Sequence, residues 1–99
     1  MKKRATVLHF EWDPGNEQKN WQKHQVKKGE AEEVFFDRDK QEYPDPNHSD
    51  GEERHIVIGR TKKRRLLFVV YTIRNTAIRV ISVRDATKPK EVSLYEEAA

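Results

Sequence analysis

The sequence predicts an α+β fold in which an antiparallel sheet of about four to five strands carries two N-terminal helices and one C-terminal helix. Residues 54–84 hold most of the aliphatic side chains, in three strand-like runs. The connections between these runs are short and polar, as antiparallel hairpins require. Helix-start signals and helical spacing of apolar residues occur on both sides of this region. Because 99 residues suffice for one hydrophobic core, we expect a single domain over residues 1–99.

The run at residues 66–72 is the predicted central strand. It is apolar without alternation, which is typical of a strand that is covered on both faces and paired on both edges. The flanking runs, residues 54–60 and 77–84, are rich in β-branched side chains. Connections at residues 61–65 and 74–76 are too short for a parallel crossover, so the three runs are expected to form two hairpins.

The N-terminal segment predicts a strand followed by a helix. Residues 6–12 contain four large apolar side chains and indicate a first strand at a sheet edge. Asp13 is a good N-cap and Pro14 suits the first helical position, so a helix is expected to run to about Gln25. This helix is polar except for Trp21, which we expect to anchor it.

Three further elements are expected outside the sheet region. Ala31, Val34 and Phe35 have helical spacing and predict a short helix over residues 30–36. Residues 41–43 indicate the start of a short strand, before a loop at 44–51 that consists of turn-forming residues. Thr87 is the expected cap of a last helix over residues 88–95, and residues 96–99 are expected to fray.

Charge is distributed unevenly along the chain, although the net charge is only +3. Residues 1–53 carry 9 Lys and Arg against 13 Asp and Glu, whereas residues 54–99 carry 11 against 4. The sheet half is therefore basic, as a phosphate-binding surface requires, although the same arginines could serve only to keep a sheet soluble. No stretch is apolar and long enough for a membrane span or a secretory signal, so a soluble cytoplasmic protein is expected.

Several classes of catalytic site are excluded by the sequence. There is no cysteine, so thiol nucleophiles and thiolate metal sites are absent, and no glycine-rich phosphate loop occurs. The neighbouring His48, Ser49 and Asp50 lie within one loop, whereas nucleophilic triads assemble from distant segments. The carboxylates of residues 45–53 fit no metal-binding motif. We therefore expect neither a metal nor another cofactor.

The side chains that remain suit the cleavage of RNA, whose 2′-hydroxyl supplies the nucleophile. The reaction needs a base, an acid and a cation that stabilises the phosphorane. Candidates for these roles are Lys23, His24, Arg54, Arg60, Tyr71, Arg79 and Arg84. Each has a structural alternative: His24 could cap its helix, Arg60 could belong to a turn, and Tyr71 could belong to the core. Strict alternation places Arg79 and Arg84 on opposite faces unless a bulge intervenes.

A succession of short segments resembles the BrnT toxin family over nearly the whole chain. The segments are Phe10-Glu11-Trp12-Asp13, Asn20 with Lys23-His24, residues 30–37, Tyr43-Pro44-Asp45, residues 48–54, Ile58-Gly59-Arg60, Val70-Tyr71-Thr72, and residues 79–84 followed by Ala86-Thr87 and Glu91. The resemblance implies a RelE-like fold. It also implies a ribonuclease toxin of a type II toxin–antitoxin pair, neutralised by a BrnA-type antitoxin that has a ribbon-helix-helix DNA-binding domain.

The resemblance also implies site residues. Lys23 and His24 match the family's Lys-His pair, Arg60 matches the arginine that follows a glycine, and Arg79 and Arg84 match the arginines of the last strand. We hypothesise that His24 is an acid or base and that Arg60 and Arg84 bind phosphate. Lys23, Glu53, Tyr71 and Arg79 are supporting candidates. A two-plus-two assembly of toxin and antitoxin is expected, with operator DNA bound only through the antitoxin.

The leading hypothesis is therefore a metal-independent endoribonuclease that cleaves RNA through a 2′,3′-cyclic phosphate and arrests growth. Two alternatives remain open. The chain could be a non-catalytic module whose basic sheet binds nucleic acid, with an affinity that falls steeply with salt. It could also be a degenerate toxin that acts only as a corepressor with its antitoxin.

Overall fold

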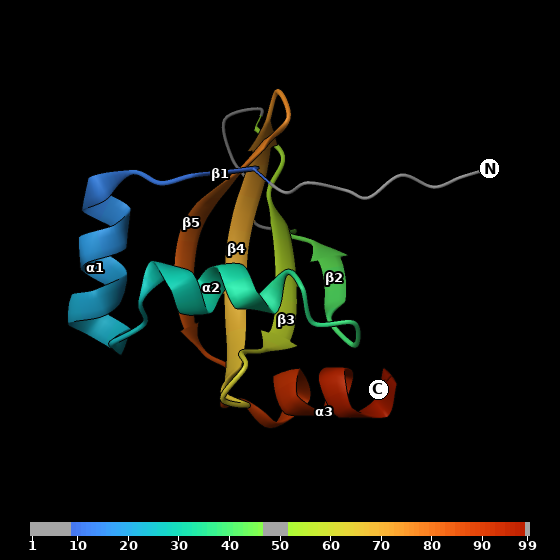
Figure 1. Ribbon diagram of the computed structural model, residues 1–99. Coiled ribbons are helices and arrows are strands. Elements are labelled where there is room, and N and C mark those ends of the chain that lie inside the picture. Colours follow the sequence, from blue (N-terminus) through green and yellow to red (C-terminus); the bar gives the residue numbers. More distant parts are fainter. Residues whose placement is uncertain (1–8, 47–51, 99) are drawn as a thin grey trace.

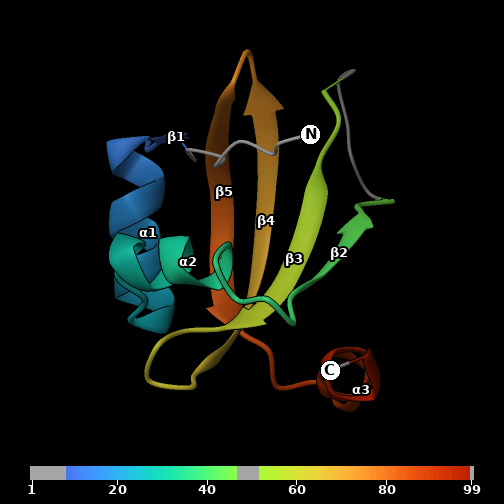
Figure 2. The ribbon, with the colours of Figure 1, turned by 45° about the vertical axis from the view of Figure 1, so that its right-hand side comes forward.

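A computed structural model describes residues 9–46 and 52–98, which form one five-stranded sheet and three helices (Figure 1). The strands are β1 (His9–Glu11), β2 (Gln41–Pro44), β3 (His55–Arg60), β4 (Leu66–Arg74) and β5 (Ala77–Asp85). The helices are α1 (Pro14–His24), α2 (Lys28–Val34) and α3 (Pro89–Ala98). The strand order β1-β5-β4-β3-β2 places β4 in the middle, which confirms the predicted central strand and both hairpins (Figure 2).

The first strand departs from the predicted pairing. Strands β2 to β5 are antiparallel, but β1 runs parallel to β5, with Phe10 opposite Ile78. The prediction of an entirely antiparallel sheet was therefore wrong at this edge. The two strands are joined through two helices and three other strands, so no hairpin constrains their direction. Residues 6–8 of the predicted strand lie outside the described residues.

A β-bulge in β5 determines which arginines share a face. Val70 pairs with Ser82 and Tyr71 pairs with Val80, so Ile81 is the extra residue. A bulge shifts the alternation of side chains by one position. Arg79, opposite Thr72, therefore lies on the same face as Arg84, opposite Phe68.

One face of the sheet packs against α2 and forms the main core. Ala31, Val34 and Phe35 are buried against the strands, as the helical spacing predicted. The strand residues beneath them include Val57, Leu67, Val69, Val80 and Val83. Gly59 allows the close approach of α2, because a Cβ there would lie 2.8 Å from a methyl group of Val34.

Helix α1 begins as predicted but is anchored differently. The Asp13 carboxylate accepts a hydrogen bond from the amide of Gly15, and Pro14 is the first helical residue. Trp21, the expected anchor, is 47% exposed. The buried residue is Asn20, whose Oδ1 accepts from the amide of Val83. The helix lies along the edge of β5 (Figure 1), where an unpaired strand amide needs an acceptor rather than an apolar partner.

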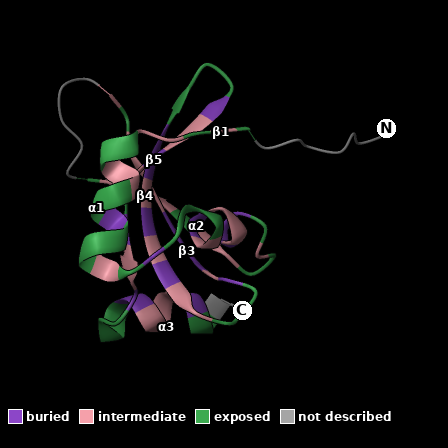
Figure 3. Ribbon diagram, turned by 60° about the vertical axis from the view of Figure 1, so that its left-hand side comes forward, coloured by how far each residue is buried: buried purple, intermediate pink, exposed green. Residues whose placement is uncertain are grey.

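The opposite face of the sheet is covered mainly at one end, by α3. Ile58, Ala86 and Tyr95 form a small second core there. Buried and half-buried residues alternate along β4 from Leu66 to Tyr71 (Figure 3), and the strand ends in the exposed Ile73 and Arg74. The central strand is therefore not fully covered on both faces. Helix α3 continues to Ala98, beyond the expected fraying point, and its first amide bonds go to the Lys88 carbonyl. Within the described residues, no helix is long and apolar enough to cross a membrane.

Candidate nucleic-acid site

Arg60 and Arg84 lie on the face of the sheet that carries α3. In the register of the sheet Arg84 is opposite Phe68 and Arg60 is opposite Leu66, two residues along the same strand. Both guanidinium groups contact α3, because Arg84 pairs with Glu91 and Arg60 lies 3.8 Å from a carboxylate oxygen of Glu96. The structure therefore brings the two proposed phosphate ligands to the same end of one face.

The Arg84 guanidinium is held firmly but retains unused donors. Its Nη1 and Nη2 donate to the two carboxylate oxygens of Glu91 at 3.0 and 2.6 Å, and the group lies 4.0 Å from the centre of the Phe68 ring. The hydrogen bond from Arg84 lowers the pKa of Glu91, which is only 8% exposed. Nη1 also donates to the Asp85 carbonyl. Of the five N–H groups of an arginine, the Nε–H and one on Nη2 are left for a ligand.

The Arg60 side chain lines a groove. The groove has a volume of about 830 Å³ and lies between α2 with its following turn, the β3–β4 connection and the end of α3. One Arg60 nitrogen donates to the Arg64 carbonyl at 2.8 Å, and the guanidinium lies 5.3 Å from the centre of the Tyr95 ring. Most of the donors of Arg60 therefore remain available to a bound anion.

Asp37 and Tyr95 fix the floor of the groove. The Tyr95 hydroxyl and the Arg60 amide both donate to Oδ2 of Asp37, each at 2.7 Å. Burial would raise the pKa of Asp37, but these donors and the Asp39 amide together lower it. Burial and the Asp37 carboxylate raise the pKa of Tyr95 to about 12. Asp37 thus stays charged and Tyr95 stays protonated at neutral pH, and together they fix the backbone from which Arg60 projects.

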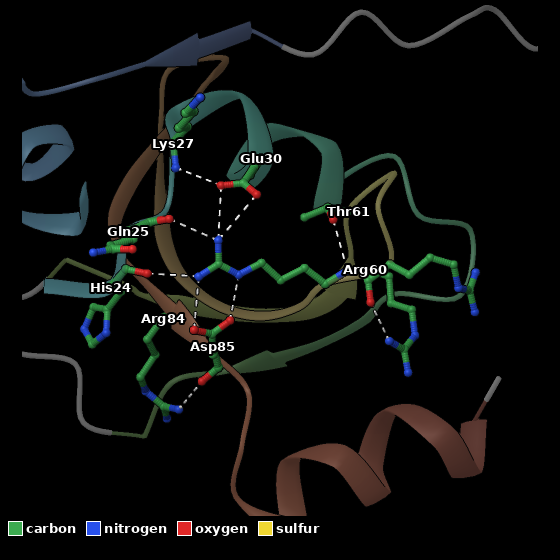
Figure 4. Close-up of polar contacts among 10 residues, drawn as sticks. His24, Gln25, Lys27, Glu30, Arg60, Thr61, Arg84 and Asp85 are labelled. Atoms are coloured by element: carbon green, nitrogen blue, oxygen red, sulfur yellow. Dashed lines mark hydrogen bonds and ion pairs between the residues drawn. The ribbon is translucent and has the colours of Figure 1, made fainter. Parts of the chain in front are cut away.

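Arg65 connects the C-terminal end of α1 to the sheet and to α2 through bonds to His24, Gln25, Glu30 and Asp85, which are labelled in Figure 4. Its guanidinium donates to both carboxylate oxygens of Asp85, at 2.7 and 3.1 Å, and to Glu30 at 3.3 Å. It also donates to the carbonyls of His24 and Gln25, at 2.9 and 3.0 Å. Gln25 ends the helix with a φ of 55°. These bonds hold the last turn of α1, and hence the backbone of His24, against the end of β5.

His24 and Arg84 lie on one side of this cluster and Arg60 on the other (Figure 4). The charge of His24 contributes to the lowered pKa of Asp85, after the larger effect of the Arg65 hydrogen bond. Arg65 Nη2 donates to both the His24 carbonyl and the Asp85 carboxylate, so the backbone of His24 is close to the residue that follows Arg84. Lys23, in the same helical turn, is exposed.

Tyr71, Glu53 and Arg79 lie toward the opposite end of the sheet. Arg79 and Arg84 are opposite Thr72 and Phe68, which are four residues apart on β4, roughly 13 Å at about 3.3 Å per residue. The Arg79 guanidinium lies 3.6 Å from an Asp13 carboxylate oxygen. Glu53 precedes β3 and is exposed, and its carbonyl accepts from Thr72. Tyr71 is buried and donates to Glu42, and burial raises its pKa. These three residues do not join His24 and Arg84 around one phosphate.

Sequence reasoning missed Arg65, Asp37 and Tyr95. A signal for Arg65 was present in the sequence. Leu67, Val69 and Tyr71 occupy every second position on the helix-covered face, and Arg65 is the preceding position in that series. This alternation distinguishes Arg65 from the three cations before it. Glu91 and Tyr95 are four residues apart on α3, a spacing that puts both on one helix face. Within residues 9–46 and 52–98, no cluster of three or more His, Asp or Glu side chains could hold a metal ion.

Comparison with known proteins identifies a matching family and a solved structure of similar fold. The family described as "Ribonuclease toxin, BrnT, of type II toxin-antitoxin system" matches residues 12–90. The crystal structure of the Brucella abortus ribonuclease toxin BrnT superposes with a TM-score of 0.63 at 21% sequence identity, covering 83% of this chain and 100% of that one. At this identity the structural likeness shows a shared fold. A search of curated proteins found no match.

Proposed function

The chain belongs to the BrnT family of ribonuclease toxins of type II toxin–antitoxin systems, and on this premise we propose that it is a metal-independent endoribonuclease. Cleavage begins when the 2′-oxygen attacks the adjacent phosphorus. The O2′–P bond forms, the P–O5′ bond breaks, and the products carry a 2′,3′-cyclic phosphate and a 5′-hydroxyl. Because the RNA supplies the nucleophile, the protein needs only proton transfer and positive charge.

The observation that carries this proposal is that Arg60, Arg84 and the last turn of α1, which carries His24, lie at one end of the sheet. In this proposal His24 moves one of the two protons, which is the commonest role of histidine in such reactions. Arg84, on the same side of the Arg65 cluster, uses its two free N–H groups to stabilise the reacting phosphate. Arg60 binds a neighbouring phosphate at the mouth of the groove, and Lys23 adds positive charge beside His24.

The remaining candidates act outside this centre. Arg74 donates to the Glu52 carboxylate at 2.9 Å, and this hydrogen bond makes the largest contribution to lowering the Glu52 pKa. The charges of Arg79 and Arg54 lower it further. This distant cluster suits the continuation of an RNA strand rather than the chemical step. Tyr71 supports the core in which it is buried, and Glu53 has no part in cleavage.

The antitoxin is proposed to be of the BrnA type, with a ribbon-helix-helix domain and a two-plus-two assembly, acting in the cytoplasm. A second candidate function is a corepressor that no longer cuts RNA. The Glu91 carboxylate and the Asp85 carbonyl together occupy three of the five donors of Arg84, which favours this candidate.

Growth arrest distinguishes the two candidates. Induced expression of the chain without antitoxin is expected to stop bacterial growth, and Arg60→Ala is expected to relieve the arrest. Lys19→Ala, which removes an exposed positive charge on α1 outside the groove, serves as the matched control and should remain toxic. A harmless wild type that still binds its antitoxin would support the corepressor.

A further inference from the structure

Phe36 is an exposed aromatic residue inside the groove that contains Arg60. Its exposed fraction is 66%, the highest among the large apolar side chains of the described residues. Building on the ribonuclease proposed above, we propose that this groove binds an unstacked nucleobase of single-stranded RNA and that Phe36 is the surface on which the base stacks. Exposed aromatic rings beside cations are the usual platforms for single-stranded nucleic acids.

Cations line the same groove as Phe36. Arg38, Lys62 and Arg64 line the groove, and in the described part of the chain none of their side chains forms an ion pair. Arg60 adds a fourth positive charge, next to Tyr95. Positive charge around an aromatic ring matches a nucleotide, whose phosphates lie on either side of its base.

The carboxylates of the groove suit the edge of a base rather than its phosphate. Five of them line the groove beside the four cations, those of Glu32, Glu33, Asp37, Asp39 and Glu96. Glu33 accepts from the Lys62 amide and Asp37 from the Tyr95 hydroxyl, so both are held in place by protein donors. Each still has unused lone pairs, because an ionised carboxylate offers about four acceptor sites. Guanine, adenine and cytosine all present N–H groups that carboxylates bind. A groove with both charge signs and one exposed ring therefore matches a nucleotide better than it matches a purely anionic or purely apolar ligand.

The position of the groove indicates which nucleotide it receives. Arg60 lines the groove and also projects from the end of β3, on the sheet face that carries Arg84. A base on Phe36 therefore belongs to a nucleotide whose phosphate lies at Arg60, beside the reacting phosphate. Such a base has to be unstacked, so the substrate is single-stranded at this point.

Binding of a cleavage-resistant RNA tests this inference. The probe is a short fluorescein-labelled strand of 2′-O-methyl nucleotides containing all four bases, and its partner is the same backbone with abasic residues. The base-containing strand and the abasic strand are each titrated with wild type and with the variants Phe36→Ala, Phe36→Trp and Phe36→Leu. Ile73→Ala is the matched control, because Ile73 is 53% exposed and lies near the far end of β4.

Phe36→Ala is expected to weaken binding of the base-containing strand about 5- to 150-fold, the range for loss of one base–aromatic stack. It should change the affinity for the abasic strand by less than about twofold. The slope of log affinity against log salt concentration should stay the same. Phe36→Trp should retain affinity, whereas Phe36→Leu should not. Lys62→Ala or Arg64→Ala should instead lower the salt slope by about 0.7 each.

Three results would overturn the inference. Phe36→Ala could bind the base-containing strand as tightly as wild type does, or it could weaken both strands equally. It could also keep RNA affinity while losing capture of the antitoxin, which would assign the groove to a protein partner. Each of these leaves the ribonuclease proposal intact if wild type still cleaves RNA, whereas a wild type that binds neither strand contradicts both proposals.

Discussion

Replacing Arg65 by alanine removes the guanidinium that joins α1, α2 and β5. Its two bonds to the carbonyls of His24 and Gln25 contribute about 0.5–1.5 kcal/mol each. The pair with Asp85 adds about 1 kcal/mol, because the Asp85 carboxylate is 42% exposed and water screens the attraction. Together these give a loss of about 2–4 kcal/mol in the free energy of unfolding. For a domain of this size the midpoint of thermal unfolding should fall by about 10 °C or more.

The assay is thermal and urea unfolding of wild type, Arg65→Ala and Lys63→Ala. Lys63 is exposed, lies in the same connection and forms no ion pair in the described structure, so its removal should change stability by less than about 0.5 kcal/mol. If Arg65→Ala unfolds within about 3 °C of Lys63→Ala, the cluster does not stabilise the fold and the reasoning fails.

The pH dependence of the same difference separates the Asp85 pair from the carbonyl contacts. Arg65 lowers the pKa of Asp85 below its ordinary value of 3.8, so the pair stabilises the folded state above that pH. This contribution is lost as the pH falls through the folded-state pKa. The stability gap between wild type and Arg65→Ala should therefore narrow between pH 7 and about pH 3. A constant gap would contradict a role for Asp85.

Two further predictions concern the packing of α3 and α2. Glu91→Gln removes the carboxylate that pairs with the half-buried Arg84, so it should lower the free energy of unfolding by about 1–3 kcal/mol in urea titrations. Glu97→Gln, at the exposed end of the helix, should be nearly neutral. Equal effects of the two substitutions would contradict the role of the Glu91–Arg84 pair in holding α3. Gly59→Ala should cost about 1–3 kcal/mol, because its Cβ would lie 2.8 Å from α2, whereas Gly29→Ala, with nothing within 4 Å, should gain about 0.5–1 kcal/mol. Changes of the same sign would refute this account of the two glycines.

Much of the fold follows from local patterns in the sequence. The structure contains the helix predicted from the Asp13 cap and the helix predicted from the spacing of Ala31 and Val34. It also contains the two hairpins predicted from the short connections. The parallel pairing of β1 could not be predicted, because it depends on contacts between residues more than 60 positions apart. The prediction that Trp21 anchors α1 was wrong for a related reason. The hydrophobicity of a helix does not reveal that its neighbour is a strand edge, where an unpaired amide needs a hydrogen-bond acceptor.

The site was predicted less completely than the fold. The resemblance singled out His24, Arg60 and Arg84, which the structure brings to one end of the sheet, although their catalytic roles stay predictions. It also grouped them with Tyr71, which is buried, and with Arg79, which lies farther along β5. The bulge that gives Arg79 and Arg84 a common face has no signature in residues 77–85, because neither Gly nor Pro marks it.

The central claim is most directly tested by incubating the purified chain with an end-labelled RNA in EDTA and mapping the product ends. We expect 2′,3′-cyclic phosphate and 5′-hydroxyl ends from wild type. The Arg60→Ala variant should produce neither, although its midpoint of thermal unfolding should be close to that of wild type. RNA that stays intact both free and in a translation extract would contradict the claim. So would cleavage that requires added magnesium and leaves 5′-phosphate ends.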